Sequence, residues 1–198
     1  MPASPPLDSP KSEPVPFIGN GTILYADIVR ITVFPAESGP LAMLELMRRH
    51  QDFNCAVIQT HHGNVSQFIG SATVAYWLEE GPDSDHAARA FAAARQMLSG
   101  LPALLSQQGG AQYDIRVTLG SGELAGQFFG PIKQFQVVGQ ARAIADRLDR
   151  ESASAGSKVR MSQYTADLLD GTANFVEQGR IARDGLADLR ILEWTARS

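Results

Sequence analysis

The sequence is poor in cysteine, in long apolar runs and in clustered basic residues. Cys55 is the single cysteine among 198 residues, so no internal disulfide can form, and a reducing compartment, the cytoplasm, is the expected location. No apolar run approaches the length of about 18 residues that a membrane-spanning helix requires. The formal net charge of −4 and the lack of basic clusters argue against nucleic acid or an anionic membrane as a partner.

The composition that is present is typical of a globular protein with one domain. Hydrophobic residues make up 44% of the chain and charged residues 19%, which allows a sizeable core. Residues 1–16 are rich in proline, serine and charged residues, and we expect them to form a flexible N-terminal arm. The folded domain is then expected to span residues 17–198.

Strand and helix patterns interleave along this domain and predict an α+β fold. Strands are expected at residues 22–32, 55–60, 65–69, 73–77, 113–119, 123–128, 134–138, 158–161, 175–177 and 189–194. Helices are expected at residues 38 to about 50, 85–105 with Gly100 and Pro102 as candidate breaks, 140 up to a loop at 152–156, and 162–169. Gly70-Ser71 and Gly120-Ser121-Gly122 are typical of tight hairpins, which favour a mostly antiparallel sheet covered by helices.

One carboxylate lies at a position where it can bind a ligand. The apolar, β-branched stretch from Thr22 to Thr32 reads as a buried strand that presents Asp27 near its end. An acid in that place can hold a hard cation, although a helix cap or a surface acid is the simpler alternative. His61-His62 also invites a metal interpretation, but no third ligand stands at a recognised spacing, so we expect turn residues there.

Further short motifs follow Asp27 in a specific order. They are Gly63 with Phe68-Ile69-Gly70, then Arg116-Val117 through Gly122-Glu123 with Gly126 and Gly130, and finally Val137-Val138-Gly139-Gln140-Ala141 with Ala145-Asp146-Arg147-Leu148. In this order, over about residues 21–194, they resemble the catalytic domain of class III adenylate and guanylate cyclases. The resemblance implies a ferredoxin-like cyclase homology domain with a mostly antiparallel sheet.

The resemblance also implies where metal ions would bind. In this family two aspartates hold two metal ions that activate the ribose 3′-hydroxyl and neutralise the triphosphate. The first aspartate corresponds to Asp27. The second falls at Ser71, whose neutral hydroxyl is a poor substitute for a carboxylate.

The nucleotide-reading positions are replaced in a similar way. The base-reading lysine of the family falls at Gln67, and its partner acid falls at Gln136. The asparagine that orients the ribose falls at Ala143, which has no polar side-chain atom. The phosphate-binding arginine is retained as Arg147. The Gly-Phe pair after the first aspartate is here Arg30-Ile31, which weakens close backbone approach to the phosphates.

These replacements predict a degenerate, catalytically inactive cyclase-like domain that acts in intracellular signalling. Family members meet head to tail and share each site between two domains, so a homodimer, or a heterodimer with another cyclase-like domain, is the expected assembly. No cofactor is expected, and Mg²⁺ or Mn²⁺ would be needed only if the domain were active.

Two alternatives stay open at this point. In the first, the domain is a sensor that binds a purine nucleotide through Arg147, with Gln67 and Gln136 reading the base by their amides. In the second, it is an active adenylate or guanylate cyclase that makes a cyclic nucleotide from ATP or GTP with Asp27 and other acids such as Glu123 or Asp146.

Overall fold

The computed structural model describes residues 15–33, 39–81, 84–107, 111–131, 133–150, 156–171, 173–183 and 186–194. The strands are β1 (Phe17–Val33), β2 (Asn64–Ile69), β3 (Ala72–Leu78), β4 (Gln112–Phe129), β5 (Gln134–Gly139), β6 (Lys158–Ser162), β7 (Val176–Arg183) and β8 (Leu186–Trp194). The helices are α1 (Gly39–Thr60), α2 (His86–Ser106), α3 (Gln140–Arg150) and α4 (Gln163–Asp167). The predicted arm at 1–16 lies almost wholly outside the described residues and stays a prediction.

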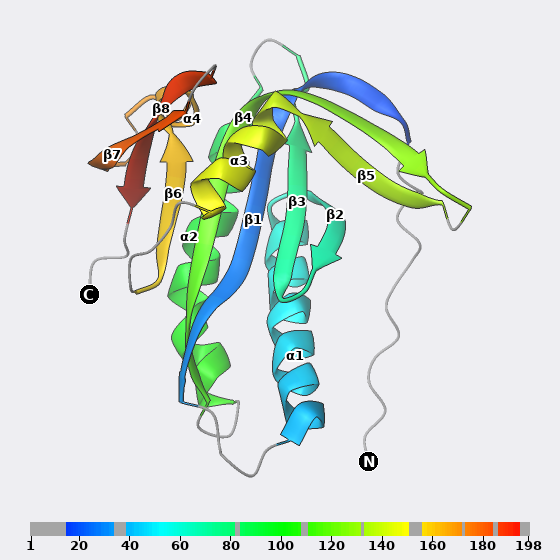
Figure 1. Ribbon diagram of the computed structural model, residues 1–198, viewed down its shortest axis with the longest axis vertical. Helices are drawn as coiled ribbons and strands as arrows, with labels where there is room; N and C mark the ends of the chain where they lie inside the picture. Colours follow the sequence, from blue (N-terminus) through cyan, green and yellow to red (C-terminus); the bar gives the residue numbers. More distant parts are fainter. Residues whose placement is uncertain are drawn as a thin grey trace.

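The strands form one sheet in the order β2-β3-β1-β4-β6-β8-β7, and β5 pairs with the C-terminal part of β4 (Figure 1). Each pairing is antiparallel except that of β4 with β6, which is parallel. The predicted α+β fold with a mostly antiparallel sheet is therefore confirmed. Among the described residues, no helix is long and apolar enough to cross a membrane.

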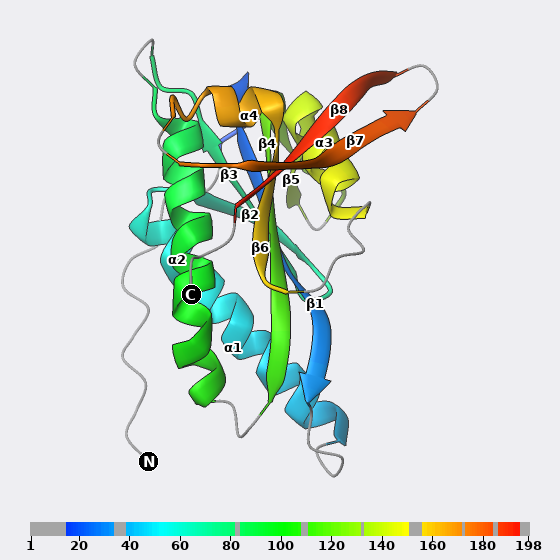
Figure 2. The ribbon, with the colours of Figure 1, turned by 90° about the vertical axis from the view of Figure 1, so that its left-hand side faces the viewer.

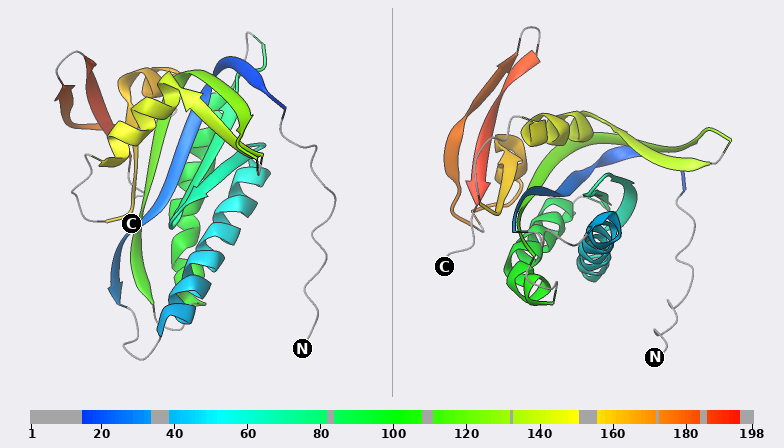
Figure 3. Two further views of the ribbon diagram at one scale, coloured as in Figure 1. Left: turned by 45° about the vertical axis from the view of Figure 1, so that its right-hand side comes forward. Right: turned by 60° about the horizontal axis from the view of Figure 1, so that its bottom comes forward.

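The helices divide between the two faces of the sheet. Helices α1 and α2 pack on one face, and α3 lies on the other (Figures 2 and 3). Alternate residues of β1 follow this division, because side chains along a strand point to opposite faces. Leu24 packs into the core under α1 and α2, whereas Ile23 and Tyr25 pack into the core under α3.

Helix α1 is longer than the sequence predicted. The expected strand at 55–60 is wrong, because the helix continues to Thr60. Its buried residues His50, Asn54, Val57 and Ile58 recur at helical spacing, which places one face of the second half against the sheet. A short apolar run such as Cys55–Ile58 fits a buried helix segment as well as a strand, and the register of the whole helix decides between them.

Strand β4 is continuous where a hairpin was expected. The predicted turn at Gly120-Ser121-Gly122 is wrong, because one strand runs through it and pairs with β1. The glycines serve close packing instead: a Cβ at Gly120 would lie 2.4 Å from the Ala141 carbonyl oxygen of α3. Gly122 has φ = +145°, a region that favours glycine. The glycines thus let α3 approach the strand.

The other predictions of local structure agree more closely. Gly70-Ser71 forms the β2–β3 turn, with φ = +59° at Gly70. Ser162 caps α4 and accepts a hydrogen bond from the Thr165 amide, although α4 ends at Asp167, earlier than the expected 169. Helix α2 runs through Pro102 to Ser106, so the candidate break there does not end it.

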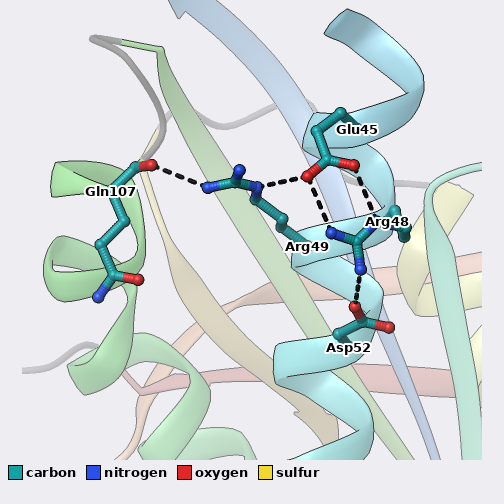
Figure 4. Close-up of polar contacts among 5 residues, drawn as sticks. All are labelled: Glu45, Arg48, Arg49, Asp52 and Gln107. Carbon is teal, nitrogen blue, oxygen red and sulfur yellow. Dashed lines mark hydrogen bonds and ion pairs between the residues drawn. The ribbon is translucent and has the colours of Figure 1, made fainter. Parts of the chain in front are cut away.

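Exposed charged residues connect the N-terminal half of α1 with the C-terminal end of α2 (Figure 4). Glu45 accepts from Arg48 Nε at 2.8 Å and from Arg49 Nε at 2.7 Å, and the two guanidiniums lower the pKa of Glu45 to about 2. Arg49 Nη1 also donates to the Gln107 carbonyl just after α2, at 3.1 Å. Arg49 thereby ties α1 to the C-terminal end of α2.

Candidate functional site

Asp27 and Ser71 meet where β1 passes the β2–β3 turn. The Ser71 hydroxyl donates a hydrogen bond to Asp27 Oδ1 at 2.5 Å, and both residues are half-buried. Helix α1 also holds the turn, because the Gln51 side-chain amide donates a hydrogen bond to the Gly70 carbonyl at 2.9 Å. The structure therefore brings together the two positions that the sequence predicted for metal binding, with one carboxylate between them.

The surroundings of Asp27 disfavour its charged form. Burial raises the pKa of the Asp27 carboxyl, and the nearby Asp149 raises it further, while the Ser71 hydrogen bond and Arg116 act in the opposite direction. Arg116 is the cross-strand partner of Asp27 on β4, and its Nε donates to Asp149 Oδ1 of α3 at 2.9 Å. A guanidinium–carboxylate pair thus lies beside the position of the predicted metal ligand.

These residues do not fit a centre for two divalent cations. Such a centre needs more than one carboxylate to offset the repulsion between the cations. Here Asp27 is joined by the neutral Ser71 hydroxyl, and the nearby Asp149 carboxylate is already paired with the Arg116 guanidinium. Among the described residues, no group of three or more His, Cys, Asp or Glu is arranged to hold a metal ion.

The acids named as substitutes are placed elsewhere. Glu123 pairs across the sheet with Asn20, whereas Asp27 pairs with Arg116, so the two acids are about 23 Å apart along the strands. Asp146 lies on α3, where it faces Arg142 at 3.8 Å and hydrogen-bonds with Tyr25. Tyr25 is on the same face of β1 as Asp27, two residues earlier.

Three of the predicted nucleotide-contacting residues lie on α3 and β5, and their surroundings differ. Arg147 is half-buried, and its Nη2 donates to the Ile181 carbonyl of β7 at 3.2 Å. Its Nε is buried and has no hydrogen-bond partner among the described residues. Ala143 is exposed, and on β5 Gln136 lies opposite Gln127 of β4. The one retained arginine is therefore bonded within its own chain.

Gln67 of β2 contacts a residue that sequence reasoning missed. Its amide oxygen, oriented by the hydrogen-bond pattern, accepts from Arg142 Nη2 at 2.9 Å. Arg142 immediately precedes Ala143 within the segment that carries the family resemblance, and its charge there was the available signal. The predicted turn at His61-His62 is confirmed, with His62 at φ = +58° and His61 hydrogen-bonded to Gln96 at 2.8 Å.

Solved structures of cyclases share this architecture. The adenylyl cyclase CyaB from P. aeruginosa superimposes with a TM-score of 0.78 at 20% identity, over 92% of this chain and 97% of that chain. The guanylate cyclase domain of RhGC from Catenaria anguillulae, in complex with GTP, gives 0.73 at 20% identity, over 91% and 98%. A non-canonical dimeric guanylyl cyclase domain of the RhoGC fusion protein from Blastocladiella emersonii gives 0.71 at 18% identity, over 91% of this chain and 98% of that chain.

At these identities the superpositions establish the fold alone. Among curated protein sequences, none matches the chain. Residues 14–191 match the family described as the adenylate and guanylate cyclase catalytic domain, which is most of the sequence. The protein therefore belongs to the family of adenylate and guanylate cyclase catalytic domains.

Proposed function

We propose that this protein is a degenerate member of its family, without cyclase activity, that acts in cytoplasmic signalling by dimerising or by binding a partner. The observation that carries the proposal is the Asp27–Ser71 contact: a hydroxyl hydrogen-bonds to the Asp27 carboxylate at 2.5 Å, at the position where the family has a second aspartate. A hydroxyl supplies no charge to balance a second cation.

The expected loss of activity is large because several positions change together. Removing one preorganised group that stabilises transition-state charge costs about 10² to 10³ in rate. Here Ser71, Gln67, Gln136 and Ala143 all lack the group that the family resemblance calls for. Arg147, the retained group, is bonded to the Ile181 carbonyl, which further supports a site that no longer serves catalysis.

Dimerisation is proposed from the family's architecture. The RhoGC guanylyl cyclase domain, which shares the fold, has been solved as a non-canonical dimer and also as a monomer. A homodimer of this chain would repeat the same replacements in both clefts, and a heterodimer would bring neither a full metal half nor a full base-reading half. Analytical ultracentrifugation of the purified protein measures the assembly; a strictly monomeric protein at tens of micromolar would contradict the homodimer.

The first test of the function is turnover. The purified protein is incubated with ATP or GTP and Mn²⁺, and the cyclic product is measured by mass spectrometry, with an active class III cyclase as positive control. We expect no product above background. Product that disappears in Asp27→Ala would overturn the proposal and favour the active cyclase with unusual ligands.

A purine nucleotide sensor is the second candidate. Arg147 favours it, because its half-buried guanidinium has an Nε without a partner among the described residues. Ligand binding to the native state raises the unfolding temperature, so ATP or GTP would stabilise a sensor, and Arg147→Ala would abolish this shift. The absence of any nucleotide-dependent shift in the wild type would contradict the sensor.

A further inference from the structure

Arg142, on the first turn of α3, is held by several groups of its own chain. Its Nη1 donates to the Val137 carbonyl of β5 at 3.1 Å. Its Nη2 and Nη1 both donate to the Gln67 amide oxygen, at 2.9 and 3.3 Å. The side chain is only 17% exposed, so the guanidinium is largely removed from water.

An aromatic ring and a carboxylate complete these surroundings. The guanidinium carbon lies 5.3 Å from the centroid of the Tyr25 ring, within the range of a cation–π contact. Asp146, one turn further along α3, lies 3.8 Å from Arg142 Nε and also hydrogen-bonds with the Tyr25 phenol.

The guanidinium connects two elements on the base-reading side of the candidate nucleotide site. Gln67 belongs to β2, and Ala143 directly follows Arg142 on α3. Under the proposed function, these two positions correspond to groups that read the base and orient the ribose. Arg142 therefore spans this half of the candidate site, from α3 to the edge strand β2.

We propose that Arg142 blocks the base-reading half of the candidate nucleotide site from within the chain and makes this domain reject purine bases. The inference rests on the proposed function, which assigns Gln67 and Ala143 to that half. An entering base would have to displace a permanently charged, planar guanidinium from its acceptors and from the Tyr25 ring. The Gln67 oxygen, which would accept from a base amino group, already receives two Arg142 donors.

A fluorescence titration with N-methylanthraniloyl ATP and GTP in Mg²⁺ tests the proposal. Arg142→Val removes the guanidinium and leaves an apolar side chain beside Tyr25. We expect no saturable signal from the wild type, which sets an upper limit on its affinity for the nucleotides. Arg142→Val should bind them with an affinity at least about tenfold above this limit, or about 1.4 kcal/mol. Arg48→Ala, which removes an exposed arginine from α1 on the other face of the sheet, is the matched control and should behave like the wild type.

Two results would overturn the proposal: equal binding by the wild type and Arg142→Val, or no binding by a variant that unfolds at the wild-type temperature. If Arg142→Val does not fold, Arg142→Lys replaces it under the same criteria, because a lysine cannot make the paired contacts to Gln67. Cyclic product from the wild type in the turnover assay would overturn the proposed function itself. Nucleotide binding without turnover by the wild type would overturn only the block by Arg142.

Discussion

The two faces of the sheet carry different kinds of residues. The face under α1 and α2 is a continuous apolar core that includes Leu24, Trp77 and Met97. The face under α3 combines an aromatic cluster with the charged residues Asp27 and Arg142. The first face holds the larger apolar core, whereas the positions that would define catalysis lie on or beside the second. The fold can therefore persist when the residues of the site change.

The largest expected effect comes from the α1–α2 face. Trp77 is 1% exposed, and its indole N–H donates to the His61 carbonyl at 2.8 Å. Trp77→Ala leaves a cavity and an unpaired carbonyl, so the free energy of unfolding should fall by about 3–5 kcal/mol. Urea denaturation measures it, with Phe68→Ala at a half-exposed position as control. A loss below about 1 kcal/mol for Trp77→Ala would contradict the importance of this face.

A pH-dependent effect should come from the same face. His50 is fully buried between Asn54 and Tyr113, and burial lowers its pKa to about 4. The unfolded state binds a proton at His50 below pH 6.5, whereas the folded state does not. The free energy of unfolding is therefore unaffected by this group above pH 6.5, and it falls by up to about 3 kcal/mol as the pH is lowered from 6.5 towards 4.

Urea denaturation of the wild type and His50→Gln at pH 7 and pH 4.5 isolates this contribution from that of the carboxylates. The wild type should lose more stability than the variant over this interval. His62→Gln, at an exposed turn position, should follow the wild type at both values. Parallel losses in all three proteins would show that His50 is not the group that titrates.

On the α3 face, the backbones of β4 and α3 pack closely at Gly120. A Cβ at Gly120 would lie 2.4 Å from the Ala141 carbonyl oxygen and 2.8 Å from the Ala145 amide nitrogen. Gly120→Ala should therefore push α3 away from β4 and destabilise the protein by about 1–3 kcal/mol. Gly19→Ala, at a β1 position with no atom within 4 Å, is the matched control and should be nearly neutral in thermal unfolding. Equal effects of the two variants would refute close packing at Gly120.

The smallest expected effect is an increase in the free energy of unfolding, and it comes from a charged residue on the α3 face. Because the pKa of Asp27 is raised mainly by burial, its charge is unfavourable at pH 7. Asp27→Asn keeps an acceptor for Ser71 and removes this charge, so the free energy of unfolding should rise by less than about 1 kcal/mol. Thermal unfolding at pH 7 measures it, and the gain should vanish at pH 3. A clear loss at pH 7 would mean that the carboxylate still stabilises the fold.

Much of the fold could be predicted from local patterns. The helical spacing of Ala141, Ala145 and Leu148 predicted α3, and Gly70-Ser71 predicted its turn, because both signals lie within a few neighbouring residues. The Gly120-Ser121-Gly122 run was misinterpreted, since a glycine needed for contact with a distant helix looks the same in sequence as one needed for a turn.

The candidate site was predictable in part. The motifs placed Asp27 and Ser71 together, and the structure brings them into contact. The link from Arg142 to Gln67 depends on how α3 lies across the sheet relative to β2, and no local pattern encodes that. Arg147 was assigned by its place in a motif, and its contact with Ile181 of β7 could not be inferred from it.

The place of β1 between β3 and β4 also constrains synthesis of the protein. On a ribosome, β3 is complete once Leu78 has been made, but the other edge of β1 stays open until β4 has been made as far as Gly126, the last residue that pairs with β1. At bacterial and eukaryotic translation speeds this interval lasts roughly 3 to 10 seconds. An open strand edge can pair with other chains, so the nascent protein passes through an aggregation-prone stage and is a natural client for chaperones that shield exposed strands.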